Sequence, residues 1–220
     1  MEQYGSTLTG KIEYDPDHFQ VQDIARRINA GTGSLGAQRY YVLITAGSDN
    51  LDVGCILDIK HQAEPTPYCY MAEGDRHIYT ESFGQNHALR HSVAYRALTN
   101  KTDDYLGWMD LSQLSDSGSL YCSVRELSPY KRAFDTTNIA RLKTFEAVAE
   151  NWGLILATAH ARADKNFDAT FVDYSFEKQV DRLTDGHHQE VRALVKAIAF
   201  SYAEQVEADW QTFLQSGFSQ

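Results

Sequence analysis

The chain has 220 residues, which is enough to bury one substantial core, or two small lobes that share an interface, without disulfides or metals. A hydrophobic content of 43% and an aromatic content of 12% are typical of a folded globular protein. Twenty basic and thirty acidic side chains give a formal net charge of −10, which argues against nucleic acid or an anionic membrane surface as the main partner, because both are bound chiefly through Lys and Arg.

The first part of the chain predicts a small antiparallel sheet. Residues 1–19 form a polar segment with no structural pattern before Asp15, and DIARRI at 23–28 has a helical appearance. Short runs rich in β-branched and aromatic residues then alternate with turn clusters, which indicates a meander. These runs are QRYYVLI (38–44), VGCILDIK (53–60), YCYMA (68–72), YLGWMDL (105–111) and LYCSVREL (120–127). Residues 86–100 have helical spacing and predict one helix inserted in the sheet.

Beyond residue 135 apolar residues recur at three and four positions, so the spacing predicts helices. One long helix is expected from Asn138 to about Ala163, and a second begins at about Gln189. Their apolar stripes are broad enough to be buried against the sheet or against each other. The predicted fold class is α+β, with a polar segment at 1–19, a sheet with one helix at 20–135, and a helical region at 136–220 packed on it.

A glycine-rich segment, NAGTGSLGAQRYYVLI at 29–44, leads into the first predicted strand. In a dinucleotide-binding fold the GxGxxG pattern follows a strand and opens a helix, whereas here it follows a helical-looking segment and opens a strand. That context excludes the dinucleotide interpretation. A glycine-rich loop that leads into a strand is typical of the lid of protein kinases, in which backbone N–H groups approach phosphate oxygens closely.

Lys60 ends the strand-like run CILDIK, 24 residues after Gly36. In a strand it shares a face with Ile56 and Asp58. A kinase lid works with a lysine on a following strand that pairs with phosphate, so the order of loop, strand, turn and lysine favours a nucleotide site. The alternative is a glycine turn followed by a solvated lysine, which is the commoner fate of Lys.

Several blocks of the sequence resemble, in order, the later blocks of the bacterial DUF2252 family, which is placed near the protein kinase-like and aminoglycoside phosphotransferase-like folds. The blocks are DIARRINAGTGSLGAQRYYVLI, ILDIK, DDYLGWMD, YCSVRELSPYK, WGLILATAHARAD and FSYAEQVEADWQTF. The resemblance covers about residues 20–215 and corresponds to the C-terminal part of the family. It implies a kinase small-lobe-like unit at 20–135 that binds ATP, with adenine against the backbone of the last predicted strand. The implied nucleotide-binding residues are Gly31, Thr32, Gly33, Ser34, Gly36, Lys60, Glu126 and Leu127.

The family also carries, upstream of the glycine-rich segment, a GDxHxxNFG-like block and an NDFDE-like block that look like a kinase catalytic loop and a metal-binding segment. This sequence has neither. Phosphoryl transfer needs side chains that orient the attacking group and hold Mg²⁺. The resemblance therefore implies nucleotide binding without phosphotransferase activity by this chain alone, with Mg²⁺ held only if another polypeptide supplies the missing segments. The surface that pairs with such a polypeptide is expected to be apolar and exposed in the isolated chain.

The sequence departs from the family pattern next to the lysine. The family usually has Glu after the lysine, where this chain has His61, and the helix at 86–100 contains no Glu to hold the lysine. Glu81 and Glu73 are the nearest candidate partners. Asp58 shares the face of the lysine, and its negative charge repels phosphate unless it holds the lysine itself.

Few other residues suggest a site. His160 and Arg162 lie near the predicted end of a helix, where positive charge suits the helix dipole, and the family match makes His160 worth testing. Three cysteines are too few and too irregular for a zinc site or a disulfide framework, so no metal site is expected, and the cytoplasm is the expected location. No apolar run reaches the roughly 18 residues that a membrane span needs, so no membrane partner is expected.

Three functional hypotheses follow. The first is a kinase-like nucleotide-binding domain that is not catalytic by itself. The second is a non-enzymatic interaction domain that retains the fold without nucleotide, which Asp58, His61 and the missing blocks favour. The third is a small enzyme that uses His160 and nearby acidic residues, with no reaction identified for it.

Overall fold

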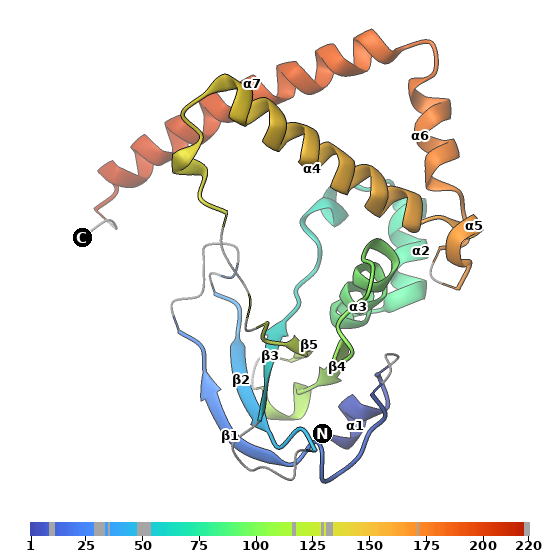
Figure 1. Ribbon diagram of the computed structural model, residues 1–220, viewed down its shortest axis with the longest axis vertical. Helices are drawn as coiled ribbons and strands as arrows, with labels where there is room; N and C mark the ends of the chain where they lie inside the picture. The colour runs from blue at the N-terminus through green and yellow to red at the C-terminus, as the bar shows by residue number, and fades with distance from the viewer. Residues whose placement is uncertain are drawn as a thin grey trace.

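The computed structural model describes residues 1–8, 12–28, 34, 36–47, 54–115, 118–128, 130, 134–170 and 172–217. In this part of the chain five strands form one antiparallel sheet in the order β1-β2-β3-β5-β4. The strands are β1 Val21–Arg26, β2 Arg39–Ile44, β3 Cys55–His61, β4 Gly107–Asp110 and β5 Tyr121–Glu126. Figure 1 shows the sheet in the lower part of the molecule and the longest helices above it. The predicted α+β class is confirmed.

The core lies on one face of the sheet, because side chains alternate between the two faces along each strand. Its strand residues are Val42, Ile44, Cys55, Leu57, Ile59, Met109, Cys122 and Val124. Tyr4, in the short helix α1 (Glu2–Gly5), and Phe19 complete this core, and their rings meet edge-on. The described residues of the 1–19 segment therefore cover this face, although the sequence pattern indicates no structure before Asp15.

Two helices, rather than the single predicted one, lie between β3 and β4. They are α2 (Glu73–Phe83) and α3 (His87–Leu98). The Asn86 side chain caps α3 by accepting a hydrogen bond from the Leu89 N–H at 2.8 Å. Helix α3 packs on β4 and β5, where the Ser92 hydroxyl donates to the Gly107 carbonyl oxygen at 3.0 Å.

Two local predictions in the sheet region are wrong. DIARRI belongs mainly to strand β1, an edge strand whose residues are all exposed, so it lacks the alternation that marks a half-buried strand. YCYMA overlaps the 3-10 helix η2 (Thr66–Tyr70) instead of forming a strand. Pro67 in the first turn of η2 explains this, because proline fixes φ at a helical value and removes a donor from any ladder. A further 3-10 helix, η3 (Ser112–Leu114), lies between β4 and β5 in the sequence.

The helical region contains the two long predicted helices, α4 (Leu142–Arg162) and α7 (His188–Gln215). The 3-10 helix η4 (Thr136–Asn138) precedes α4, and two unpredicted helices, α5 (Lys165–Asp168) and α6 (Phe176–Thr184), lie between α4 and α7. Asp164 fixes the connection from α4 to α6, since its carboxylate accepts the Ser175 hydroxyl at 2.6 Å and the Asn166 N–H at 2.8 Å. These bonds, that of Ser175 above all, hold the pKa of Asp164 below its ordinary value.

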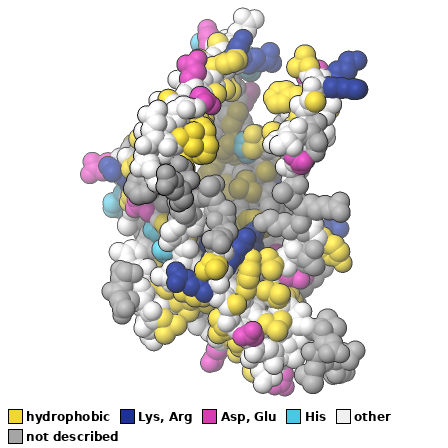
Figure 2. All heavy atoms as spheres, turned by 90° about the vertical axis from the view of Figure 1, so that its left-hand side faces the viewer, with side chains coloured by type: hydrophobic (Ala, Val, Ile, Leu, Met, Phe, Trp, Pro, Cys, Tyr) yellow, Lys and Arg dark blue, Asp and Glu magenta, His cyan; other side chains and the backbone are white. Residues whose placement is uncertain are grey.

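The apolar stripes of α4 and α7 are exposed, so the expectation that they are buried is wrong. The exposed residues are Leu142, Phe145, Trp152, Leu154, Ile155 and Leu156 on α4, and Leu194, Val195, Ile198, Phe200, Tyr202, Val206, Trp210, Phe213 and Leu214 on α7. Figure 1 shows why: the two helices diverge from the sheet instead of lying on it. Figure 2 shows hydrophobic side chains around a hollow in this upper part of the molecule. Although both helices are rich in apolar residues, none of the described helices is long and apolar enough to cross a membrane.

Candidate functional site

The glycine-rich segment connects β1 to β2, which pair as an antiparallel hairpin. Gly31, Thr32 and Gly33 lie outside the described residues. Ser34 and Gly36 lie within them, and the Ser34 carbonyl accepts the Ala37 N–H at 3.1 Å. Gly36 has a φ of 76°, in the left-handed region that favours glycine, and no heavy atom lies within 4 Å of the Cβ that another residue would add. Backbone conformation, rather than crowding, therefore favours glycine at position 36.

Lys60 lies on β3, on the face opposite the core, as the alternation predicts. Pairing with the two neighbouring strands sets Lys60 opposite Arg39 of β2 and Ser123 of β5. The same pairing sets Asp58 opposite Arg125 of β5. Because directly opposite residues in an antiparallel pair point to the same side, these side chains share one surface. We call Arg39, Lys60 and Arg125 the cationic face.

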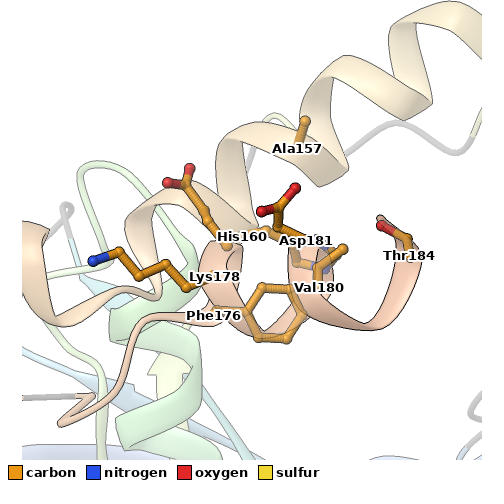
Figure 3. A pocket seen from close by; sticks show the side chains of 8 residues that line it. Ala157, His160, Phe176, Lys178, Val180, Asp181 and Thr184 are labelled. Atoms are coloured by element: carbon orange, nitrogen blue, oxygen red, sulfur yellow. The ribbon is translucent and has the colours of Figure 1, made fainter. Parts of the chain in front are cut away.

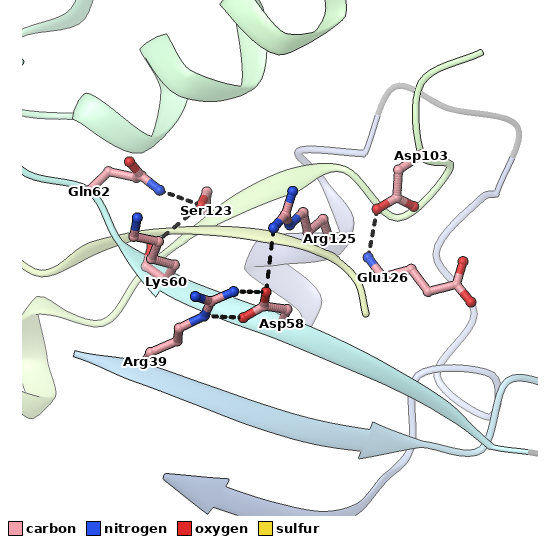
Figure 4. A network of polar contacts seen from close by, with 8 residues as sticks. All are labelled: Arg39, Asp58, Lys60, Gln62, Asp103, Ser123, Arg125 and Glu126. Carbon is pink, nitrogen blue, oxygen red and sulfur yellow. Dashed lines mark hydrogen bonds and ion pairs between the residues drawn. The ribbon is translucent and has the colours of Figure 1, made fainter. Parts of the chain in front are cut away.

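Asp58 forms ion pairs with two arginines and not with Lys60. Its carboxylate accepts the Arg39 Nε–H at 2.6 Å and a second hydrogen bond from Arg39 Nη2, and Arg125 Nη2 lies 3.7 Å from Asp58 Oδ2 (Figure 4). Asp58 is 2% exposed, so this ion pair is buried. The hydrogen bonds that Arg39 donates to Asp58, and the charge of Asp58, raise the pKa of Arg39 against the effect of burial. The expectation that Asp58 either repels phosphate or holds the lysine is therefore corrected, because Arg39, one strand away, neutralises it.

Lys60 is left without a carboxylate among the described residues, since no hydrogen bond or ion pair joins its ammonium to any of them. Partial burial lowers its pKa, and the charges of Arg39 and Arg125 lower it further while Asp58 opposes them. Of the two candidate partners, Glu73 is exposed in the first turn of α2, and Glu81 of the same helix lies 3.4 Å from His77. The cationic face therefore holds three positive charges around one carboxylate.

His91 of α3 is a member of this site that sequence reasoning missed. Burial lowers its pKa to about 4, and the charges of Arg90, Arg125 and Lys60 act in the same direction. The ring is therefore neutral at pH 7, and α3 packs on β5, the strand that carries Arg125. The alternation of side chains around Lys60 could not predict that His91 belongs to this site, because only the packing of α3 on β5 brings His91 to the cationic face.

A small cavity adjoins the cationic face at the end where β3 finishes. It has a volume of about 310 Å³, which is at the lower end of the range for ligand pockets. Its lining is polar and comprises His61, Gln62, Ala63, Glu64, Gln85, His87, Ser119 and Tyr121. The Gln62 amide donates to the Ser123 hydroxyl, opposite Lys60, at 2.8 Å (Figure 4). Arg39, Lys60 and Arg125 do not line this cavity, so the Gln62–Ser123 hydrogen bond is its link to the cationic face.

The implied adenine contacts already have protein partners. The Glu126 N–H donates to Asp103 Oδ2 at 2.6 Å, as Figure 4 shows, and the Leu127 N–H donates to the Ile56 carbonyl at 2.7 Å. An adenine ring would need other groups, or these bonds would have to break. The arrangement therefore supports contacts to phosphate better than contacts to a base through these two N–H groups.

His160 and Arg162 lie at the end of α4, in two different cavities. His160 lines a cavity of about 580 Å³ between α4 and α6, shown in Figure 3 with Ala157, Val180 and Thr184. Its ring centroid is 4.5 Å from that of Phe176. No group of three or more His, Cys, Asp or Glu side chains in the described part of the chain is arranged to hold a metal ion. The structure thus does not bring these two residues together with Lys60.

Comparison with known proteins identifies a family and nothing finer. The chain matches the family model described as "Uncharacterized protein conserved in bacteria (DUF2252)" over residues 1–216. No curated protein and no solved structure matches it. The match includes the first 19 residues, which the resemblance left out, and this agrees with the place of Tyr4 and Phe19 in the core. The chain belongs to the DUF2252 family.

Proposed function

We propose that the chain binds a nucleotide, with ATP as the ligand and its phosphates on the cationic face. The observation that carries the proposal is the set of three cations, Arg39, Lys60 and Arg125, around the single carboxylate of Asp58. Burial lowers the pKa of Lys60, and the charges of Arg39 and Arg125 lower it further; a phosphate group placed there offsets this repulsion. Arginine and lysine are also the side chains that best match phosphate oxygens.

The order of the elements supports the kinase-like form of this proposal. A hairpin with a glycine-rich connection, a strand with a lysine, intervening helices and two more strands are also the parts of a kinase nucleotide lobe. The glycine-rich segment lies between β1 and β2 in the sequence, and Arg39, the first residue of β2, pairs with Lys60 of β3. The departure is the lysine partner: among the described residues no Glu pairs with Lys60, and the neighbouring carboxylate of Asp58 is bound to Arg39.

Catalysis is not part of the proposal for this chain alone. The sequence lacks the GDxHxxNFG-like and NDFDE-like blocks that supply the catalytic carboxylate and the Mg²⁺ ligands. In the proposed arrangement these segments come from another polypeptide, and Mg²⁺ is bound only when that polypeptide is present.

An interaction domain that retains the fold without nucleotide is the second candidate. The exposed stripes of α4 and α7 favour it. The chain exposes 16585 Å², whereas a compact monomer of 24.9 kDa exposes about 10,200 Å². The difference exceeds the area of an ordinary protein–protein interface. A polypeptide whose apolar surface fills the hollow beside α4 and α7 would bury part of that area under either candidate.

The test is an ATP titration by calorimetry, with and without Mg²⁺, on the wild-type chain and on Lys60→Ala. Lys143→Ala is the matched control, because Lys143 is an exposed lysine at the start of α4, away from the sheet. We expect saturable binding by the wild type and the control, and loss of binding in Lys60→Ala. Thermal unfolding is an independent check, since a ligand at a hundred times its Kd stabilises the native state by about 2.7 kcal/mol.

The outcomes separate the two candidates. Equal ATP affinity in Lys60→Ala and the wild type would place the ligand elsewhere and refute the assignment of the site. Absence of binding at millimolar ATP would reject the nucleotide candidate and leave the interaction domain.

A further inference from the structure

A second cavity, separate from the cationic face, lies where three segments meet. These are the end of α3 with the loop that follows it, the end of α4, and α5 with the turn after it. The cavity has a volume of about 450 Å³, within the usual range for small ligands. Three cations line it: Arg96, Lys101 and Arg162. Their separation in the sequence shows that only the packing of α3 against α4 brings them together.

Arg162 has unused capacity for hydrogen bonding. Its guanidinium carbon lies 4.5 Å from the centre of the Phe167 ring, so the aromatic face holds the group in place. Its Nε–H is buried and has no hydrogen-bond partner among the described residues. A buried donor without an acceptor is destabilising by about 1–3 kcal/mol, so a ligand oxygen placed here would remove a real penalty.

The two neighbouring cations add charge that lacks a counterion. Burial lowers the pKa of Arg96, whose Nη2 donates to the Leu106 carbonyl at 2.5 Å. Lys101 has a φ of 51°, which is uncommon for a residue other than glycine, and this backbone conformation sets the direction in which the Lys101 side chain leaves the loop. Within the described ranges, no ion pair joins any of the three cations to a carboxylate.

The two acidic residues in the lining are bound to other donors. Asp103 accepts the N–H groups of Tyr105 at 2.9 Å and Glu126 at 2.6 Å. Asp168 accepts the N–H of Thr170 at 2.9 Å and its hydroxyl at 2.6 Å. Both carboxylates are therefore hydrogen-bonded to other groups, and neither forms an ion pair with one of the three cations.

We propose that this cavity is an anion site that binds a phosphate group. The Arg162 guanidinium, already oriented by the Phe167 ring, makes the charge-assisted hydrogen bonds, and Arg96 and Lys101 supply the remaining positive charge. The group is either free inorganic phosphate or the phosphate of a small phosphorylated compound, and the volume of the cavity accommodates both. This proposal does not depend on nucleotide binding at Lys60.

The test is a titration of the full chain with inorganic phosphate, followed by amide chemical shifts in NMR spectra, at constant ionic strength set with chloride. A second titration uses phenyl phosphate, and tighter binding of this ester than of inorganic phosphate would identify a phosphorylated compound as the ligand class. We expect saturable shifts in residues 99–103 and 162–170. Shifts confined to the cationic face, or none at 20 mM phosphate, would overturn the proposal.

Variants assign the binding to the cavity. Arg162→Gln is expected to weaken phosphate binding at least about tenfold, because a hydrogen bond to a charged group is lost. Lys101→Asn is a second variant that keeps a residue suited to the left-handed backbone and removes only the charge, so it remains informative if Arg162→Gln does not fold. Arg192→Gln, on exposed α7, is the matched control, and Lys60→Ala should leave these shifts unchanged. Equal affinity in the wild type and both cavity variants would refute the site.

Discussion

Asp58→Asn removes the charge that holds two arginines together across three strands. The side chains of Asp58 and Arg39 are 2% and 9% exposed, so the substitution leaves a buried guanidinium without its counterion. Breaking a buried ion pair from one side destabilises a protein by about 3–5 kcal/mol. The amide oxygen of Asn still accepts one hydrogen bond from Arg39, so we expect the lower end of that range, about 3 kcal/mol.

Urea unfolding followed by circular dichroism measures this loss. With a urea dependence of about 2 kcal/mol per molar, a loss of about 3 kcal/mol lowers the midpoint by about 1.5 M. The control is the double variant Arg39→Met/Asp58→Leu, which removes both charges and leaves neither of them buried alone. We expect it to be more stable than Asp58→Asn. A midpoint shift below about 0.5 M in Asp58→Asn, or a double variant as unstable as the single one, would refute the buried pair.

Three further predictions concern α3, the N-terminal segment and the exposed helices. Because the folded pKa of His91 is about 4 and lies below the unfolded value of 6.5, the stability tied to its neutral ring is complete above pH 6.5 and is lost as the pH falls toward 4. At about 1.4 kcal/mol per pKa unit the loss reaches about 3 kcal/mol, and His91→Gln should abolish it in acid unfolding curves; an unchanged pH dependence would contradict this. Gly107→Ala should lower the melting temperature, since its Cβ would lie 2.6 Å from Thr7 Oγ1 and 2.8 Å from Tyr4 Cε2, and an unchanged melting temperature would argue against this packing. Ile198→Glu/Phe213→Glu should reduce binding of the dye ANS without lowering the melting temperature, because both side chains are exposed; a large loss of stability would show that they are buried.

Much of the sheet is predictable from local sequence. Strands β2, β3 and β5 are runs of β-branched and aromatic residues bounded by turns, and the prediction places each of them within two residues. Strand β1 is not predictable in this way, since VQDIAR pairs through its backbone alone and buries no side chain. Helix α2 is missed for a similar reason, because EGDRHIYTESF has no buried residue to create an apolar period.

The candidate site is predictable only in part. Alternation along β3 places Asp58 and Lys60 on one face without any knowledge of the fold. The pairing of Asp58 with Arg39 depends on the register between β2 and β3, which the sequence does not specify. Apolar periodicity in α4 and α7 likewise predicts that a face exists but not what covers it, and for this reason the expected burial is wrong.

The most direct test of nucleotide binding at the cationic face is the pKa of His91, measured by proton NMR with and without saturating ATP, with the resonance assigned through His91→Gln. Without ATP the pKa should lie near 4, held down by burial and by the charges of Arg90, Arg125 and Lys60. Phosphates bound at the cationic face would offset the charges of Arg125 and Lys60, so ATP should raise this pKa. An unchanged pKa of His91 at an ATP concentration that saturates the calorimetric signal would show that the phosphates bind elsewhere.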